Sequence, residues 1–167
     1  PNAGHSALAK LEEELDVTII TQNVDNLHEK AGSSNVIHLH GELFKSRSTI
    51  DKSLIYDMTS WELNLGDLCE KGGQLRPHIV WFGEMVPLME TAAEQVANAD
   101  LFMVVGTSLA VYPAAGLIDH ALPQIDKYVI DPNIPNLREY DNLIAIAEPA
   151  TTGVTKAAEI ILGRSRN

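Results

Sequence analysis

The sequence predicts an α/β fold in which a parallel sheet carries helices on both faces. Short apolar runs that are typical of strands alternate with segments that have helical periodicity, and this alternation favours a parallel sheet. Polar residues and glycines follow directly after five of the predicted strands, where open parallel sheets bind their ligands. The length of 167 residues suits one domain with a hydrophobic core.

The predicted elements alternate along most of the chain. Leu8, Leu11 and Leu15 recur at helical spacing and predict the first helix. The uniformly apolar run at residues 101–105 is typical of a strand covered on both faces, and Pro113 lies near the first turn of the helix that follows. In chain order we expect a helix at 5–14, strands at 17–21 and 35–39, a polar turn at 40–42, an irregular inserted lobe at 45–77, a strand at 78–82, a helix at 88–97, a strand at 101–105, the helix at Pro113, strands at 127–130 and 143–147, and a helix at 155–162.

The composition is that of an ordinary globular protein, with 45% hydrophobic and 21% charged residues. A net charge of -11 argues against nucleic-acid binding; it could favour basic protein tails, although solubility is the commoner reason for such a charge. Cys69 is the one cysteine, which excludes an internal disulfide and an all-cysteine zinc site. No run approaches the roughly 20 apolar residues of a membrane span, and no secretory signal opens the chain, so we expect a cytoplasmic protein.

The polar residues at the strand ends predict one long ligand-binding crevice. Gly106 would allow close backbone approach, Thr107 and Ser108 add hydroxyl groups, and the following helix start favours negative charge, so a phosphate would fit there. An ordinary strand-to-helix turn explains this tripeptide about as well. The five clusters are Gln22, Asn23, Val24 and Asp25; His40, Gly41 and Glu42; Gly83 and Glu84; Gly106, Thr107 and Ser108; and Asp131 and Asn133.

The histidines leave two chemical alternatives open. His40 is the strongest candidate for a general base, because Gly41 follows it where the strand ends and a neutral imidazole accepts a proton near pH 7. A metal-dependent hydrolase is the other alternative, although no His-Glu-x-x-His pattern supports it and a lone histidine is more often structural. Its ligands would come from His28, His38, His40 and His78, with Glu84 as base.

Four motifs carry a family resemblance: "TQNVDNLHEKAG" at residues 21–32, "VIHLHGEL" at 36–43, "RPHIVWFGE" at 76–84 and "VVGTSLAVYPAA" at 104–115. In this order they resemble the sirtuins, which are NAD-dependent protein lysine deacylases, and "RPHIVWFGEM" is most similar to the bacterial members. The resemblance covers nearly the whole chain. It implies a Rossmann-like domain at residues 1–44 and 78–167, with residues 45–77 at the place of the family's small zinc-bearing lobe.

The resemblance also implies a reaction and roles in it. The acyl oxygen of an acyl-lysine protein or peptide attacks the ribose carbon of NAD as nicotinamide leaves, and the products are free lysine, nicotinamide and acyl-ADP-ribose. His40 matches the base that removes a ribose hydroxyl proton, and we group Asn23 and Asp25 with it as catalytic residues. These two, with Gln22 and Val24, match the motif that holds the nicotinamide-ribose end of NAD.

Further binding roles follow from the same resemblance. The backbone of Val80, Trp81 and Phe82, in the strand predicted at 78–82, would pair with an extended acyl-lysine peptide by strand addition. The whole substrate-binding segment comprises Val80, Trp81, Phe82, Gly83 and Glu84. The remaining NAD contacts would be Gly106, Thr107 and Ser108 for phosphate and ribose, Asp131, Pro132 and Asn133 for the adenosine ribose, and Ala150 for adenine.

This sequence departs from the family in three respects. The glycine-rich Gly-Ala-Gly-x-Ser segment is expected before residue 1, so the chain would be the C-terminal two-thirds of a catalytic domain. Only Cys69 remains of four zinc-binding cysteines, with Ser46 and Ser48 where the first pair would lie, so we expect a zinc-free lobe and no metal site. Asp131 stands in place of an asparagine; it can accept from ribose hydroxyls but adds negative charge near NAD.

Two alternatives to a deacylase stay open. The missing glycine-rich segment favours a non-catalytic sirtuin-like module that binds a nucleotide or a peptide. An ADP-ribosyl transferase would share the nucleotide site.

Overall fold

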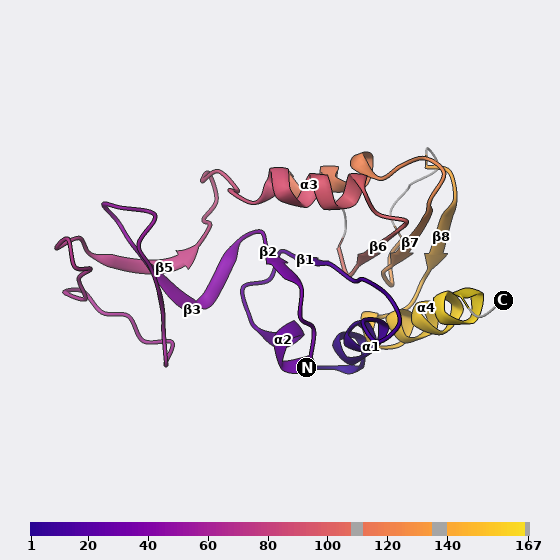
Figure 1. The fold of residues 1–167 in the computed structure, drawn as a ribbon, viewed down its shortest axis with the longest axis horizontal. Coiled ribbons are helices and arrows are strands. Elements are labelled where there is room, and N and C mark those ends of the chain that lie inside the picture. The colour runs from indigo at the N-terminus through magenta and orange to yellow at the C-terminus, as the bar shows by residue number, and fades with distance from the viewer. Residues whose placement is uncertain (108–111, 135–139, 166–167) are drawn as a thin grey trace. The chain divides into compact units, whose positions relative to one another are not determined.

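The computed structural model describes residues 1–107, 112–134 and 140–165 (Figure 1). The chain forms two compact units. Within the described ranges, no helix has both the length and the apolar character that crossing a membrane requires. The first unit comprises Pro1–Ile20, Leu27–Ile37 and Leu88–Asn167, and the second comprises Thr21–Asn26 and His38–Pro87. The second unit is therefore larger than the lobe predicted at residues 45–77.

The first unit is built on a parallel sheet whose strands lie in the order β6-β7-β8 (Figure 1). These strands are β6 (Leu101–Val105), β7 (Asp126–Ile130) and β8 (Leu143–Ile146). The central strand β7 is buried from Lys127 to Ile130, because neighbouring strands and packed residues surround it. The parallel strands predicted at 101–105, 127–130 and 143–147 are confirmed to within a residue.

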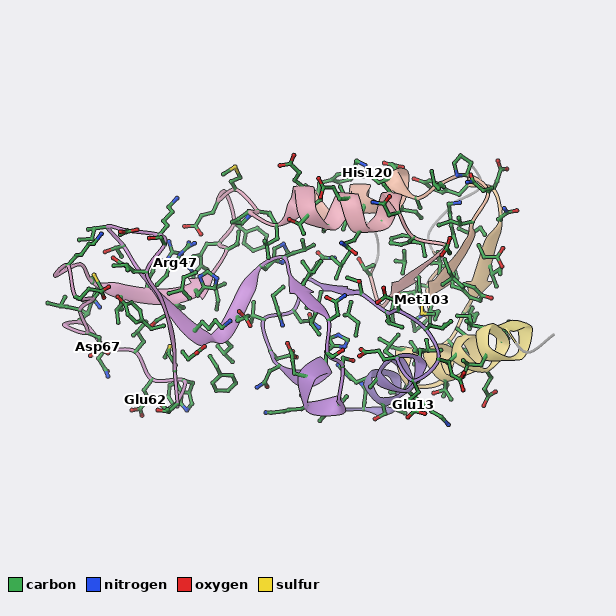
Figure 2. All side chains as sticks on the ribbon, viewed as in Figure 1. Glu13, Arg47, Glu62, Asp67, Met103 and His120 are labelled. Carbon is green, nitrogen blue, oxygen red and sulfur yellow. The ribbon has the colours of Figure 1, made fainter. Side chains whose placement is uncertain are left out.

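Helices cover both faces of this sheet, as the sequence predicts. The helices α1 (Ala3–Leu11) and α4 (Ala150–Ser165) contact each other, and both contribute residues to the core on one face. Tyr128 and Ile130 of β7 pack there with Val154 of α4. Met103, which Figure 2 labels on β6, packs against the same cluster.

The opposite face carries a second cluster, in which Val104 and Val129 pack with Ile118. Ile118 belongs to the 3₁₀ helix η1 (Ala114–His120), and η1 contacts the helix α3 (Met89–Ala97). Alternate residues of one strand point to opposite faces, so Val129 faces η1 while its neighbours face α4. This alternation within an apolar strand produces the two-sided core.

The segment that contains the motif at residues 21–32 connects the two units along the chain. β1 (Ile19–Thr21) and β2 (Val36–His38) form a two-stranded sheet, and α2 (Leu27–Ala31) lies between them in sequence. The strands predicted at 17–21 and 35–39 are confirmed, although both are shorter than expected.

The second unit contains an antiparallel sheet in the order β4-β3-β5. Its strands are β3 (Gly41–Ser48), β4 (Ile55–Asp57) and β5 (Leu75–Ile79). The strand predicted at 78–82 within the parallel sheet is therefore wrong: β5 ends at Ile79 and pairs with β3. The polar turn at 40–42 and the irregular lobe are likewise corrected, because β3 begins at Gly41 and the lobe holds strands. All residues of β5 are half-buried, so this strand does not show the alternation of apolar and polar residues that would have predicted it.

Four helices differ from the prediction, and one of them, α2, was not predicted at all. α1 begins earlier because the side chain of Asn2 accepts hydrogen bonds from the amides of Gly4 and His5 at its first turn. α4 begins at Ala150 rather than 155, since β-branched threonines and a glycine weaken the helical signal of its first turn. The segment after Pro113 is a short 3₁₀ helix.

Candidate functional site

His40 lies in the second unit, directly before β3. Its Nδ1 is 3.0 Å from the backbone carbonyl oxygen of Gln22. A carbonyl oxygen can only accept, so the hydrogen of the neutral ring lies on Nδ1 and the lone pair lies on Nε2. The ring is half-buried, which leaves part of it accessible. The fold therefore gives His40 the tautomer that a general base needs.

The segment after β1 is fixed to the same part of the chain through its backbone. The carbonyl of Val24 accepts from the amide of Leu43 at 2.7 Å, and the carbonyl of Asn23 lies 3.4 Å from Nδ1 of His38. With the contact from Gln22 to His40, three successive carbonyls are engaged by residues 38–43. These three contacts are made by the backbone. The side chain of Asn23 is exposed, and those of Gln22 and Asp25 are half-buried.

A second set of predicted residues lies at the carboxyl edge of the parallel sheet in the first unit. Gly106 follows β6 and Asp131 follows β7, and these strands are neighbours. The amide of Gly106 donates to Ile130 at 2.9 Å, and that of Asp131 donates to Ile146 at 3.3 Å. Ala150 begins α4 shortly after β8, so its place is set by the same sheet. Ser108 lies outside the described residues.

These residues have the chemistry of a nucleotide-binding edge. Gly106 has a φ of +61°, and a Cβ added there would meet no atom within 4 Å, so the backbone is open to close approach. Asp131 accepts from the amide of Asn133 at 2.8 Å, and its carboxylate has further capacity to accept from ribose hydroxyls. The N-terminus of a helix as long as α4 favours a negative group. The residues present therefore fit NAD.

The segment predicted to bind substrate continues from β5 as a turn. Val80 donates its amide to the carbonyl of His40 at 2.9 Å, and the amide of Glu84 donates to the carbonyl of Trp81 at 2.9 Å. The side chains of Trp81 and Phe82 are exposed, Phe82 fully so. Extended backbone thus ends near Trp81, because a turn occupies the residues after it.

The metal-hydrolase alternative gains no support from this geometry. Hydrogen bonds from Arg76 and the amide of Trp81 lower the pKa of Glu84 to about 2, which makes its carboxylate a poor base. The ring of His28 lies tilted against that of His5, with ring centroids 4.7 Å apart. Among the residues that the structure describes, no three His, Cys, Asp or Glu side chains are grouped as metal ligands.

The lobe at residues 45–77 has a buried cluster where the family's zinc would be expected. Cys69 Sγ lies 3.2 Å from the hydroxyl oxygen of Ser48, which also accepts from the amides of Ile50 and Asp51 at 3.2 Å each. Ser46 is buried nearby on the same strand. One thiol and two hydroxyls do not match the thiolate, imidazole and carboxylate donors of a structural zinc site.

Sequence reasoning did not single out Arg47 and Arg76, which bind Glu84 from β3 and β5 (Arg47 is labelled in Figure 2). Arg47 is an ordinary basic residue in its own segment, and Arg76 opens the motif at residues 76–84 but has no predicted role there. Only the pairing of the two strands brings them together, so no local signal could have identified their shared contact with Glu84.

Comparisons with known proteins agree with this arrangement. The Sir2 family model matches residues 1–113. A protein of Helicobacter pylori strain J99, named NAD-dependent protein deacylase, is 53% identical over 152 residues, which are 90% of this chain and 64% of that protein. The chain thus spans somewhat less than two thirds of this relative.

Two solved structures share the fold. A mutant Sir2 homologue in complex with ADP-ribose superposes with a TM-score of 0.87 at 35% identity, covering 99% of this chain and 68% of that one. A Sir2 homologue in complex with NAD gives a TM-score of 0.84 at 36% identity, covering 98% and 66%. The α/β fold is therefore Rossmann-like, and the matched motifs and fold lead to one conclusion: the chain belongs to the Sir2 family.

Proposed function

We propose that this chain belongs to an NAD-dependent protein lysine deacylase and supplies its base and most of its NAD-binding residues. The observation that carries the proposal is the hydrogen bond from Nδ1 of His40 to the carbonyl of Gln22, which leaves Nε2 as a proton acceptor. The name of the Helicobacter pylori relative supports the reaction class. Bound NAD would supply the ribose carbon that is attacked and the hydroxyl whose proton His40 removes.

The proposed binding residues form two groups along the chain. Gln22, Asn23, Val24 and Asp25 would bind the nicotinamide-ribose end, where the carboxamides of half-buried Gln22 and exposed Asn23 offer both donors and acceptors. In the first unit, the carboxyl edge of the parallel sheet would bind phosphate, ribose and adenine. The residues proposed for these contacts are Gly106, Thr107, Asp131, Pro132, Asn133 and Ala150, together with Ser108, which lies outside the described residues.

The substrate in this proposal is an acyl-lysine protein or peptide. It would pair with carbonyl groups of the backbone that leaves β5, chiefly that of Val80, because the amides of Val80 and Trp81 already donate to His40 and Glu84. The turn through Phe82, Gly83 and Glu84 follows. The exposed apolar side chains of this segment suit a peptide that buries them on binding.

Calorimetric titration of the full chain with ADP-ribose and NAD, with and without an acetyl-lysine peptide, tests this proposal. We expect Kd values of about 10⁻⁶ to 10⁻³ M for the nucleotides, the range of typical enzyme substrates. The Asn23→Ala variant is expected to weaken NAD binding about tenfold, because one or two hydrogen bonds are lost. Asn64→Ala, at an exposed asparagine of the same unit, is the matched control.

The outcomes separate the alternatives. A folded chain that binds no nucleotide contradicts the proposal. A chain that binds NAD and peptide but releases no nicotinamide is instead a non-catalytic binding module.

We also propose that the lobe at residues 45–77 is stabilised without zinc, by the hydrogen bonds that Ser48 makes with Cys69 and with the amides of Ile50 and Asp51. Incubation with EDTA is then expected to leave the thermal midpoint unchanged. Ser48→Ala is expected to lower the free energy of unfolding by about 1–2 kcal/mol, because two amides and the thiol lose their acceptor. Ser60→Ala, at an exposed serine, is the control. Stoichiometric zinc by elemental analysis, or a midpoint that falls with EDTA, would contradict this prediction.

A further inference from the structure

Two arginines face each other across the strands of the second unit. Arg47 on β3 and Arg76 on β5 are direct cross-strand partners in the register. Like charges at directly opposite positions repel each other and destabilise a sheet. The side chain of Arg47 is only 11% exposed, so water screens this repulsion poorly. The pair therefore requires an anion.

The anion is the carboxylate of Glu84. Arg76 donates through Nη1 to Oε1 at 2.6 Å and through Nη2 to Oε2 at 3.3 Å, which is a two-pronged contact. Arg47 donates through Nη2 to Oε2 at 3.2 Å. These three residues form the arginine–glutamate cluster, and both carboxylate oxygens are engaged within it.

The arginine–glutamate cluster also forms hydrogen bonds with backbone groups of the neighbouring turn. The amide of Trp81 donates to Oε2 of Glu84 at 3.0 Å, and the amide of Glu84 donates back to the carbonyl of Trp81 at 2.9 Å. Arg76 reaches the carbonyl of Ile79 at 3.4 Å as well. The turn at residues 81–84 is thus tied at both ends to the antiparallel sheet, while Trp81 (54% exposed) and Phe82 keep their side chains outside.

We propose that Glu84 is a positioning residue, which with Arg47 and Arg76 fixes the turn at residues 81–84 so that the exposed side chains of Trp81 and Phe82 are presented to an acyl-lysine peptide. This inference rests on the proposed function, which identifies the bound peptide as an acyl-lysine peptide. Glu84 acts through the backbone and not by contact with substrate, because intrachain donors already occupy its carboxylate. Holding the segment before binding reduces the ordering entropy that the peptide must otherwise offset.

The test combines hydrogen exchange with binding, using the full chain. In Glu84→Ala we expect the Trp81 amide, followed by NMR, to exchange about tenfold faster, because a charge-assisted hydrogen bond is lost. The Kd for an acetyl-lysine peptide is expected to rise about tenfold while the Kd for ADP-ribose is unchanged. A general loss of stability would not separate the two ligands in this way.

Asp51→Ala is the matched control. Asp51 also combines an ion pair, to Lys71 at 2.7 Å, with a hydrogen bond from a backbone amide, that of Ser53 at 3.0 Å, in the same unit. We expect it to leave Trp81 exchange and peptide affinity unchanged. Should Glu84→Ala fail to fold, Arg76→Lys keeps the charge but loses the two-pronged geometry, and about a threefold effect on both readouts is expected.

Each result decides the inference. Trp81 exchange that is unchanged in both cluster variants overturns it, and so does equal acceleration in Asp51→Ala. Faster exchange with unchanged peptide affinity also overturns it, because the cluster would then only stabilise the fold. A wild-type chain that binds no acetyl-lysine peptide contradicts the proposed function, whereas the exchange rates still show whether Glu84 fixes the turn.

Discussion

Replacing His40 with alanine is expected to lower kcat for NAD-dependent deacetylation about 10³-fold, because general-base catalysis by a positioned side chain contributes roughly 10²–10⁴-fold. The structure supports this expectation through Nδ1, whose hydrogen bond to Gln22 leaves the proton-accepting Nε2 available. KM for the peptide is expected to change little, since the ring is proposed to act on a proton and not to bind the peptide. Nicotinamide release from NAD and an acetyl-lysine peptide measures both constants.

Two further variants make this expectation specific. His40→Asn keeps a donor that can reach the Gln22 carbonyl but has no basic nitrogen, so it should lose activity as severely as the alanine variant. His120→Ala removes an exposed histidine from η1 and should leave kcat unchanged. Near-normal turnover in His40→Asn would show that the hydrogen bond matters and the base does not. No nicotinamide release from the wild-type chain would contradict the proposed function.

Gly41→Ala is expected to destabilise the second unit by at least about 3 kcal/mol, which is a large effect for one methyl group. Gly41 has a φ of +85°, and a Cβ there would lie 1.9 Å from the carbonyl oxygen of His78. That oxygen belongs to β5, which pairs with β3 at this point, so neither strand can move away without breaking the pairing. Urea unfolding followed by tryptophan fluorescence measures the loss, because Trp61 and Trp81 both lie in the second unit.

Gly83→Ala is the control for this prediction. Gly83 has the same φ of +85°, yet a Cβ there would meet nothing within 4 Å. Gly83→Ala should therefore lower the free energy of unfolding by only about 1 kcal/mol, the cost of a residue with a Cβ at positive φ. If the two variants prove equally stable, the close approach of β3 to β5 is not what requires glycine at position 41.

The first unit could be predicted from the sequence because its signals are local. A strand buried on both faces must be apolar throughout, and residues 101–105 and 127–130 satisfy this requirement except at Lys127. Lys127 is nonetheless buried, with its ammonium group bound by the carbonyls of Leu122, Pro123 and Ile125. No composition rule predicts such a site, because the three acceptors are backbone atoms.

The candidate site was predictable to a similar extent. Polar residues after apolar strands identified Gln22–Asn23 and His40 in the sequence, and the structure joins them through a backbone carbonyl. The contact itself was not predictable, because the sequence suggested side-chain roles at position 22 and said nothing of its carbonyl. Gly106 and Asp131 lie at one edge because β6 and β7 are parallel neighbours, which follows from strand order.

The sequence by itself determined the α/β class, the parallel strands and the family, since each depends on residue type at short spacing. Tertiary structure alone decided the antiparallel pairing of β3 with β5, the contact of His78 with Gly41, and the meeting of Arg47, Arg76 and Glu84. The physical reason is the separation of the interacting residues along the chain. Hydrophobic periodicity reports burial within one helix or strand. Cross-strand partners far apart in the chain are selected by loop closure and packing, and these leave no pattern in the sequence of either strand.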